Sequence, residues 1–259
     1  MQIPQLRQEA FADSPFPVQV LRETDSTNDA LKRMCHAPHG TALVTGRQTK
    51  GRGRLGRSFS SPEGGVYLSV LLKPNAPASE LLHLTAMAAV AVRRAIIDCC
   101  GVTPEIKWTN DLVYGGRKLC GILTELVRKD GALCAILGIG VNCNTEAACF
   151  PQEVRKIAVS LREITGRLID PNDLARCMVR RLFEMDAALL TEKKAWMAEY
   201  AAACVTVGKP VRVISGTERS PAFAEGIDEN GALLVRWENG ETAAITTGEV
   251  SVRGMNGYI

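Results

Sequence analysis

The sequence predicts an α+β protein with a mixed β-sheet core, helices packed around it, and a small β-barrel at its C-terminal end. Several strand-like runs between residues 104 and 144 follow one another through tight turns, whereas the long helical patterns lie elsewhere, at 79–100 and 171–190. Strands grouped in this way favour an α+β fold over an alternating, doubly wound one. After residue 204 short strand-like segments recur between Asn-Gly pairs, which is typical of a small β-barrel.

The first hundred residues predict three strands and two helices. Short apolar runs predict the strands, which are 18–21, 42–45 and 66–72. A cluster of Thr, Asp, Ser and Asn at 24–28 offers several N-caps for a short helix over 30–34. Apolar residues recur at helical spacing over 79–100, and Gly101 ends that helix.

The middle of the chain predicts three more strands. Residues 105–108 and 117–126 form the first two. Asp130-Gly131 is a tight hairpin signal. It precedes 132–141, a nearly unbroken apolar run that predicts a strand buried on both faces.

The C-terminal half predicts three helices followed by the barrel. The helices are expected at 151–164, at 171–190 after an Asp170 cap with proline at the first helical position, and at 192–203. The barrel strands are expected at 205–208, 210–214, 222–227, 232–237, 241–246 and 250–252. This change of pattern divides the chain into two predicted domains, 1–204 and 205–259.

The composition is that of an ordinary soluble globular protein, with 46% hydrophobic and 23% charged residues. A net charge of +3 is small for a dedicated DNA-binding domain. Nine cysteines without a C-x-x-C pair predict buried thiols in a reducing cytosol, and three scattered histidines predict no metal site. Neither a signal peptide nor a membrane-length apolar run occurs, so we expect a cytoplasmic protein.

The densest positive charge lies in the glycine-rich segment 51–57, GRGRLGR, which we call the basic loop. Its glycines match the dinucleotide fingerprint G-x-G-x-x-G, but residues 46–50 separate it from the preceding strand, and turn residues rather than a helix follow it. We therefore expect a mobile loop that closes over an anion with arginine side chains and backbone N–H groups. A solvated loop without a ligand and a nucleic-acid contact are the alternatives.

Four polar clusters come from different strand ends or helix starts. They are Ser26-Thr27-Asn28, Gln48 with the basic loop, 107–118, and 138–144. If they converge, the pocket combines an apolar floor, neutral hydrogen-bonding groups, and several cations facing one carboxylate, which suits a polar ligand with an acidic tail beside a nucleotide. Motifs of serine hydrolases, zinc peptidases and Walker-type ATPases are absent from the sequence. Taken singly, these residues have ordinary explanations as helix caps, exposed lysines, core or turns.

In combination these motifs resemble those of the biotin–protein ligases. The family's glycine–arginine loop stands here as GRGRLGR (51–57), its second signature as KWTNDL (107–112) with GRKLCGIL (116–123), and its third as GIGVNCN (138–144). The likeness spans roughly residues 18–252. Thr109 stands where many relatives carry proline, and Phe59 stands where the aromatic residue is often tryptophan.

The resemblance implies a core fold like that of class II aminoacyl-tRNA synthetases and biotin ligases, followed by an SH3-like barrel. It also implies a two-step reaction. Biotin and ATP, with Mg²⁺, would form biotinyl-5′-AMP and pyrophosphate, and a lysine of a biotin carboxyl carrier protein would then take the biotinyl group. The carrier would belong to acetyl-CoA carboxylase or another biotin-dependent carboxylase, and the family allows a homodimer.

The resemblance further assigns roles to residues. Lys118 would lie at the junction of carboxylate and phosphate, and Arg54 would cover the acyl phosphate. Asp111, the third implied catalytic residue, would orient the incoming lysine or a magnesium-bound group. The implied biotin-binding residues are Ser26, Thr27, Asn28, Gln48, Arg52, Gly53, Arg54 and Lys118. The implied nucleotide-binding residues are Arg52, Lys107, Trp108, Asn110 and Asn142, and no residue is implied as a dedicated metal ligand.

Other functions stay open at this point. A lipoate or octanoate ligase or transferase shares the core fold, but its pocket is expected to need fewer polar groups than Ser26, Thr27 and Gln48 provide. A nucleic-acid-binding module is the non-enzymatic alternative. Some relatives are repressors with an N-terminal winged helix, but about 17 residues precede the first predicted strand here, so we expect no DNA-binding role.

Overall fold

The computed structural model of the chain describes residues 3–34, 36–129, 132–246 and 250–254. Its core is a seven-stranded sheet with the spatial order β1-β2-β3-β7-β6-β5-β4. β1 and β2 run parallel and the other neighbouring pairs are antiparallel, so the sheet is mixed, as the sequence predicted. The strands are β1 (Val18–Leu21), β2 (Ala42–Thr45), β3 (Val66–Leu72), β4 (Glu105–Lys107), β5 (Asp111–Tyr114), β6 (Arg117–Lys129) and β7 (Ala132–Val141).

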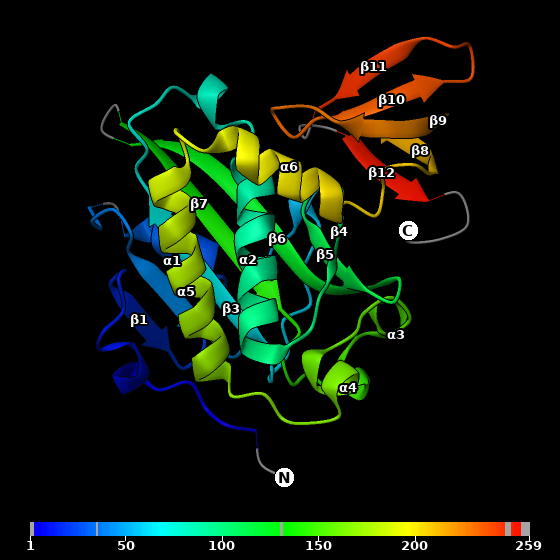
Figure 1. Ribbon diagram of the computed structural model, residues 1–259. Helices are drawn as coiled ribbons and strands as arrows, with labels where there is room; N and C mark the ends of the chain where they lie inside the picture. The colour runs from blue at the N-terminus through cyan, green and yellow to red at the C-terminus, as the bar shows by residue number, and fades with distance from the viewer. Residues whose placement is uncertain (1–2, 35, 130–131, 247–249, 255–259) are drawn as a thin grey trace.

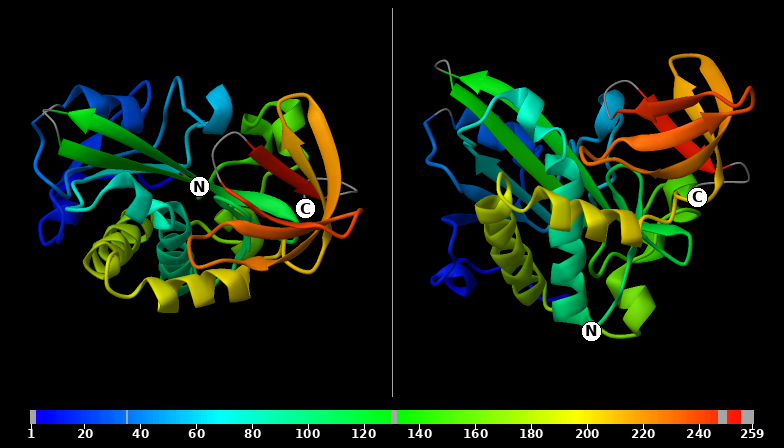
Figure 2. Two further views of the ribbon diagram at one scale, coloured as in Figure 1. Left: turned by 90° about the horizontal axis from the view of Figure 1, so that it is seen from above. Right: turned by 45° about the horizontal axis from the view of Figure 1, so that its top comes forward.

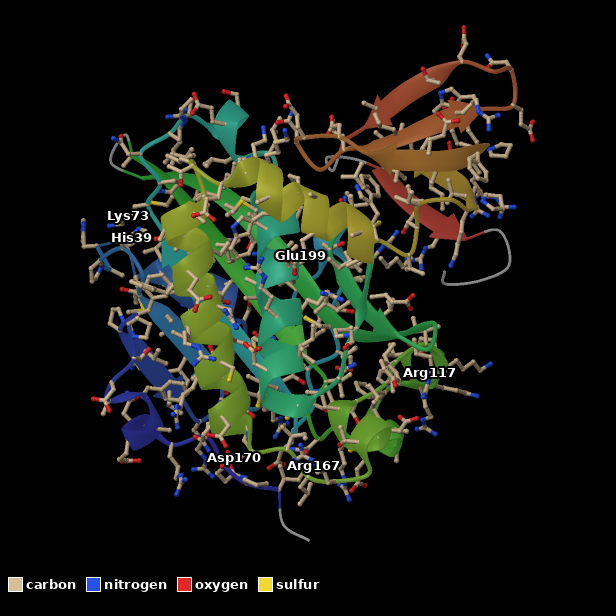
Figure 3. The ribbon with its side chains drawn as sticks, in the orientation of Figure 1. His39, Lys73, Arg117, Arg167, Asp170 and Glu199 are labelled. Atoms are coloured by element: carbon tan, nitrogen blue, oxygen red, sulfur yellow. The ribbon has the colours of Figure 1, made fainter. Side chains whose placement is uncertain are left out.

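Two long helices lie side by side on one face of this sheet, and a third crosses them (Figure 1). Glu199 lies on the third helix, over 193–203, and points toward the helix over 84–100 (Figure 3). Its Oε2 is 2.5 Å from Nη2 of Arg94 on that helix. The helices are α1 (Thr27–Arg33), α2 (Leu84–Cys100), α3 (Gln152–Arg155), α4 (Leu161–Thr165), α5 (Pro171–Ala188) and α6 (Lys193–Ala203), of which α2, α5 and α6 form this layer.

Side-chain alternation gives the sheet two apolar faces. Val44 of β2 belongs to the main core beneath α2 and α5, whereas its neighbour Leu43 belongs to a smaller cluster with Leu31 of α1 and Ile136 of β7. Successive strand residues point to opposite faces. α1 therefore packs on the face opposite to α2 and α5, and this second face carries the polar clusters described below.

The sequence correctly predicted the capped start of α5 but misplaced two other helix starts. The helix expected over 30–34 begins earlier, at Thr27, and ends at Arg33. The Ser26 hydroxyl caps α1, and Asp170 caps α5 with proline at its first position. The helix expected from residue 79 begins instead at Leu84, after a 3-10 turn over Ala78–Leu81. The break coincides with His83, whose buried ring Nε2 lies 3.0 Å from the carbonyl oxygen of Leu189 beyond α5. A tertiary contact thus overrides the helical periodicity.

Two other expectations about elements were wrong, and one strand was missed. The helix expected over 151–164 is divided into α3 and α4, because the chain between them pairs with β6: Lys118 N donates to Ile157 O (2.6 Å) and Val159 N donates to Lys118 O (2.9 Å). Residues 205–208 form a turn rather than a strand, with Gly208 at φ 77°. β5 was not expected at all. Asp130-Gly131 lies outside the described residues, although β6 and β7 pair antiparallel on either side of it.

The C-terminal strands form a second, five-stranded antiparallel sheet in the order β11-β10-β9-β8-β12 where a small barrel was expected. It lies beside α6 and the β4–β5 end of the large sheet (Figure 2). The precise domain division at 204/205 stays a prediction. No helix among the described residues is long and apolar enough to cross a membrane. The strands are β8 (Pro210–Ser215), β9 (Glu218–Ile227), β10 (Leu233–Trp237), β11 (Thr242–Ile245) and β12 (Val250–Gly254).

Candidate active site

A cavity of about 270 Å³ opens on the face of the large sheet that carries α1. The start of α1, the basic loop, β4 to β7, the segment before α4 and strand β12 line it. Every residue to which the resemblance assigned a role lies in this lining, although the roles themselves stay predictions. These residues are Ser26, Thr27, Asn28, Gln48, Arg52, Gly53, Arg54, Lys107, Trp108, Asn110, Asp111, Lys118 and Asn142.

The basic loop folds back on itself at the mouth of the cavity. Gly53 N donates to Arg57 O (2.7 Å), and Phe59 N donates to Gly51 O (2.9 Å). A Cβ on Gly51 would stand 2.4 Å from the carbonyl oxygen of Phe59, so the close approach of the two backbone segments requires glycine there. Leu55, at the tip, has a φ of 56° and is 50% exposed. The loop is therefore folded against the cavity, and its expected mobility stays a prediction.

Neutral hydrogen-bonding groups form one wall. Gln48 Oε1 accepts from the backbone N (2.8 Å) and the hydroxyl (3.1 Å) of Thr27, while Gln48 Nε2 donates to Ser61 Oγ (2.9 Å). The fully buried Ser69 hydroxyl of β3 lies 2.7 Å from Thr27 Oγ1 and 2.6 Å from Asn28 Oδ1. These bonds hold the start of α1 against β3 and the loop. Sequence reasoning missed Ser69 because it stands inside an apolar strand pattern.

Glycines on two neighbouring strands form the floor. Gly121 of β6 is paired with Gly140 of β7, and Phe59 lies over both, since an added Cβ would come within 2.8 Å or 2.4 Å of its ring. At Gly138 an added Cβ would stand 2.2 Å from Asn28 Oδ1. The glycines in the second and third signatures therefore provide space for an aromatic ring and an amide above the sheet.

An ion pair joins β5 and β6 at the cavity. Lys118 Nζ lies 2.6 Å from Asp111 Oδ1, and their side chains are 25% and 14% exposed. The ammonium group also lies 5.5 Å from the centre of the Phe59 ring, a cation–π arrangement. The lysine and aspartate of the second signature are thus in direct contact, and Lys118, whose side chain is partly exposed, belongs to the lining of the cavity.

The side chain of Asn142 holds the backbone of Lys118 in place. Its Nδ2 donates to Lys118 O (3.2 Å) and to Val159 O (3.1 Å), and its backbone N donates to Leu119 O (3.0 Å). Asn142 was expected to bind the nucleotide. Both of these side-chain hydrogen bonds run to the protein backbone, so Asn142 contributes at least to the position of Lys118.

Burial lowers the pKa of two further cationic side chains in the cavity. Desolvation lowers the pKa of Lys107 to about 8, although Asp111 opposes this and Arg253, Lys118 and Arg57 add to it. Burial likewise lowers the pKa of Arg54, whose Nη1 lies 3.5 Å from Asn110 Oδ1. Asn110 is itself held by a bond from its Nδ2 to Ile122 O (2.5 Å). Both cations are held where an anionic ligand would be favoured.

Trp108 joins the cavity to the C-terminal sheet. Its backbone N donates to Thr206 Oγ1 (3.0 Å), and its indole Nε1 donates to Gly231 O (2.9 Å). The residue is 3% exposed. Its polar atoms therefore bind the protein, and nucleotide binding by Trp108 would use the face or edge of the ring.

The charge of the lining is strongly positive. Among the described lining residues, six cationic side chains accompany one carboxylate, that of Asp111. No group of His, Cys, Asp and Glu able to hold a metal ion occurs in the described part of the chain. Such a cavity suits a ligand that carries several negative charges. The cationic residues are Arg52, Arg54, Arg57, Lys107, Lys118 and Arg253.

Several lining residues were missed by sequence reasoning. Arg253 and Val252 reach the cavity from β12, and four apolar residues reach it from the segment around α3. No local pattern marks them, because their position depends on how the second sheet and the α3–α4 connection pack against the first. The four are Phe150, Val154, Ile157 and Ala158.

Comparisons with known proteins identify the family. Residues 20–142 match the family model described as Biotin/lipoate A/B protein ligase family, and residues 206–253 match the Biotin protein ligase C terminal domain. The bifunctional ligase/repressor BirA of Bacillus subtilis (strain 168) is 36% identical over 227 residues, which cover 85% of this chain and 69% of that protein. The chain belongs to the biotin protein ligase family.

Two other members of the family extend the comparison. The biotin--[acetyl-CoA-carboxylase] ligase of Paracoccus denitrificans is 32% identical, over 84% of this chain and 93% of that protein. The structure of the biotin protein ligase from Aquifex aeolicus in complex with biotin and ATP superposes with a TM-score of 0.80 at 33% identity, covering 92% of this chain and 99% of that one. Membership in the biotin protein ligase family confirms the expected α+β fold class.

Proposed function

We propose that the chain activates biotin with ATP to give biotinyl-5′-AMP, and then transfers the biotinyl group to a lysine of a biotin carboxyl carrier protein. Its membership of the biotin protein ligase family supports the ligase class. The observation that carries the assignment is the cavity itself, in which a neutral polar wall and a glycine floor lie next to six cations. This combination suits an uncharged ring system with an acidic tail, bound beside a triphosphate.

In the first step a biotin carboxylate oxygen attacks the α-phosphorus of ATP, and pyrophosphate leaves. Both reactants are anions, so catalysis requires positioning and charge stabilisation more than proton transfer. Lys118 supplies the ammonium group nearest the reacting oxygens, and its contact with Asp111 holds it in place before the substrates arrive. Arg54, from the basic loop, covers the acyl phosphate once it has formed.

In the second step the acceptor lysine attacks the acyl carbonyl, and AMP leaves. The attacking amine loses a proton as the amide bond forms, and the phosphate of the leaving AMP takes it. Asp111 is the one carboxylate among the described lining residues. We assign Asp111 the orientation of this amine. Magnesium requires several oxygen ligands. With one carboxylate in the lining, the triphosphate would supply most of them, so we propose that the ion enters as part of the MgATP substrate.

The experiment that tests this function is intact-protein mass spectrometry of a carrier domain after incubation with the chain, ATP and Mg²⁺. A mass increase of one biotinyl group is expected with biotin and none with lipoate or octanoate, because Thr27 and Gln48 provide hydrogen bonds that a ureido ring can use. Modification by lipoate or octanoate alone would contradict the assignment. Light scattering on the same sample tests the homodimer that the family allows.

The free thiols of the described residues support the proposed cytosolic location. Eight cysteines are free in the described part of the chain, which is the usual state in a reducing compartment. We propose the carrier of acetyl-CoA carboxylase as the acceptor, since a ligase for that carrier is the relative from Paracoccus denitrificans. Neither DNA nor a membrane is part of the proposed function.

A further inference from the structure

A cluster of charged side chains beside the cavity connects the basic loop to α1 and β6. Glu125 Oε1 lies 2.7 Å from Lys32 Nζ and 3.2 Å from Arg52 Nη2. The other carboxylate oxygen, Glu125 Oε2, accepts from Asn28 Nδ2 (2.9 Å). Arg52 Nη1 also pairs with Asp29 Oδ1. Glu125 therefore receives donors from the loop and from two successive turns of α1, and we call this group the loop clasp.

The loop clasp differs from the isolated ion pairs on the surface of the protein. Glu125 is 19% exposed, and one of its donors, Asn28, is 3% exposed and bonded to buried Ser69. Exposed pairs contribute little on their own, whereas networks with fixed geometry contribute more. Its two carboxylates balance two cations, so release of Arg52 would leave the clasp with an excess negative charge. The contact with Asp29 raises the pKa of Arg52 accordingly.

The clasp acts on two parts of the cavity at once. Arg52 stands between Gly51 and Gly53, which form the backbone bonds that fold the loop, so holding its guanidinium group fixes the loop against the sheet. On the other side, the bond to Asn28 fixes the first turn of α1, where Thr27 faces the cavity. The same carboxylate thus sets the position of the loop and of the neutral polar wall.

We propose that Glu125 is a positioning residue that keeps the basic loop closed over the cavity through Arg52. The proposal rests on the proposed function to the extent that the closed loop retains biotin and the adenylate. The sequence analysis assigned Arg52 to ligand binding. The clasp adds a separate task, in which the guanidinium group binds the protein while the neighbouring backbone remains available to the ligand.

Limited trypsin digestion tests the clasp without using activity. Trypsin cleaves after arginine, and the loop offers Arg52, Arg54 and Arg57. In Glu125→Gln, ligand-free protein is expected to be cut in the loop about fivefold faster, the upper end of what an exposed ion pair contributes, because the open form is more populated. Glu23→Gln is the matched control, since it removes a carboxylate 3.1 Å from Arg47 just before the loop. The control should be cut at the wild-type rate.

Kinetics then separates positioning from general damage. Glu125→Gln is expected to raise the KM for biotin and the rate of adenylate release by about fivefold each, while kcat for ATP–pyrophosphate exchange stays within about twofold. Arg52→Lys keeps the charge but cannot reach both carboxylates, so partial rescue relative to Arg52→Gln is expected. In the double variant Glu125→Gln/Arg52→Gln the two effects should not add.

The outcomes are distinguishable. Unchanged loop cleavage and unchanged KM for biotin in Glu125→Gln would overturn the proposal. If that variant does not fold, Asp29→Asn applies the same two measurements from the other carboxylate. Should wild-type protein fail to use biotin, the proposed function is wrong, whereas the trypsin comparison still decides whether the clasp holds the loop.

Discussion

The ammonium group of Lys118 is the cation that we expect to matter most for the first reaction step. A hydrogen bond to a charged group contributes about 1.5–3 kcal/mol. Lys118→Ala is therefore expected to slow biotin-dependent ATP–pyrophosphate exchange by at least roughly tenfold, because about 1.4 kcal/mol corresponds to that factor. Exchange at the wild-type rate would remove Lys118 from the mechanism.

The adjacent residue provides a control for this substitution. Arg117 pairs with Glu163 at 2.7 Å, and both side chains are more than 40% exposed. Figure 3 shows Arg117 at the outer side of the molecule near α3 and α4. Arg117→Ala removes a positive charge one position away and is expected to change exchange by less than about twofold, as is usual for an exposed pair.

The lowered pKa of Lys107 leads us to expect that nucleotide binding depends on pH. Burial lowers its pKa to about 8, so its charge is lost as pH rises through that value. The KM for ATP is therefore expected to rise between about pH 7 and about pH 9, and Lys107→Met should lack this component. For folding the sign is opposite. Between about pH 8 and the ordinary value of 10.5 the unfolded chain binds more protons, so this residue makes stability rise with pH.

At the scale of elements, a substitution in the basic loop is expected to leave synthesis of the adenylate intact while impairing its retention in the cavity. Arg54 is held beside Asn110 at the cavity. Arg54→Gly is expected to retain adenylate synthesis but to release the product, so that labelling of lysines on a bystander protein rises by roughly tenfold, the effect of losing one charged hydrogen bond. Mass spectrometry of added albumin measures this labelling. Its absence would contradict the covering role of Arg54.

A side chain added at Gly138 of β7 is expected to cause a steric clash at the floor of the cavity. A Cβ at Gly138 would stand 2.2 Å from Asn28 Oδ1, and Asn28 is held by both Ser69 and Glu125. Gly138→Ala is therefore expected to lower stability by about 1–3 kcal/mol and to raise the KM for biotin. Gly46→Ala is the control, because the nearest heavy atom is 4.0 Å from its added Cβ. Chemical denaturation and biotin titration check both variants.

The extent to which the sequence predicted the site follows from what a local pattern can encode. Lys118, Asp111 and Gln48 stand in recognisable sequence motifs, so their participation in one site could be proposed from the sequence, although strand β5, which begins at Asp111, was not predicted. Ser69 and Glu125 lie in apolar strands, and their roles depend on the residues of α1 that they contact. The sequence pattern of the strands does not reveal these contacts. Such partners are known only after the register of β3 and β6 against α1 is fixed.

The same limit explains the misplaced elements. Helical periodicity continues through His83, but a contact of its ring with the far end of α5 delays the helix start. The run over 151–164 is interrupted because Ile157 and Val159 pair with Lys118, which lies more than thirty positions away. Long-range pairing decides between local alternatives of similar free energy. Caps are easier to predict because each acts within three residues: Asp170 was assigned as a cap, and Ser26 lay among the candidates at 24–28.

At the scale of the whole molecule, the C-terminal sheet and its turns contact the rest of the chain in two places, at the cavity and at the helical layer. Arg253 of β12 belongs to the lining. The turn between β9 and β10 packs against the helical layer, where Lys193 Nζ donates to Asn230 Oδ1 (2.6 Å) and Gly231 approaches Ala86. This turn also receives the indole N–H of Trp108. The second sheet is therefore connected to the signature segment that carries Lys107 and Asp111.

This connection predicts that Trp108→Phe affects both folding and nucleotide binding. The substitution leaves the buried Gly231 carbonyl without the indole donor, which is expected to cost about 1–3 kcal/mol of stability. It also frees the segment that follows Lys107, so the KM for ATP should rise. Trp196→Phe is the control, because Trp196 is equally buried (3%) but contacts Arg94 within the helical layer. If both variants lose stability while neither changes the KM for ATP, the C-terminal sheet supports the fold without positioning the nucleotide site through Trp108.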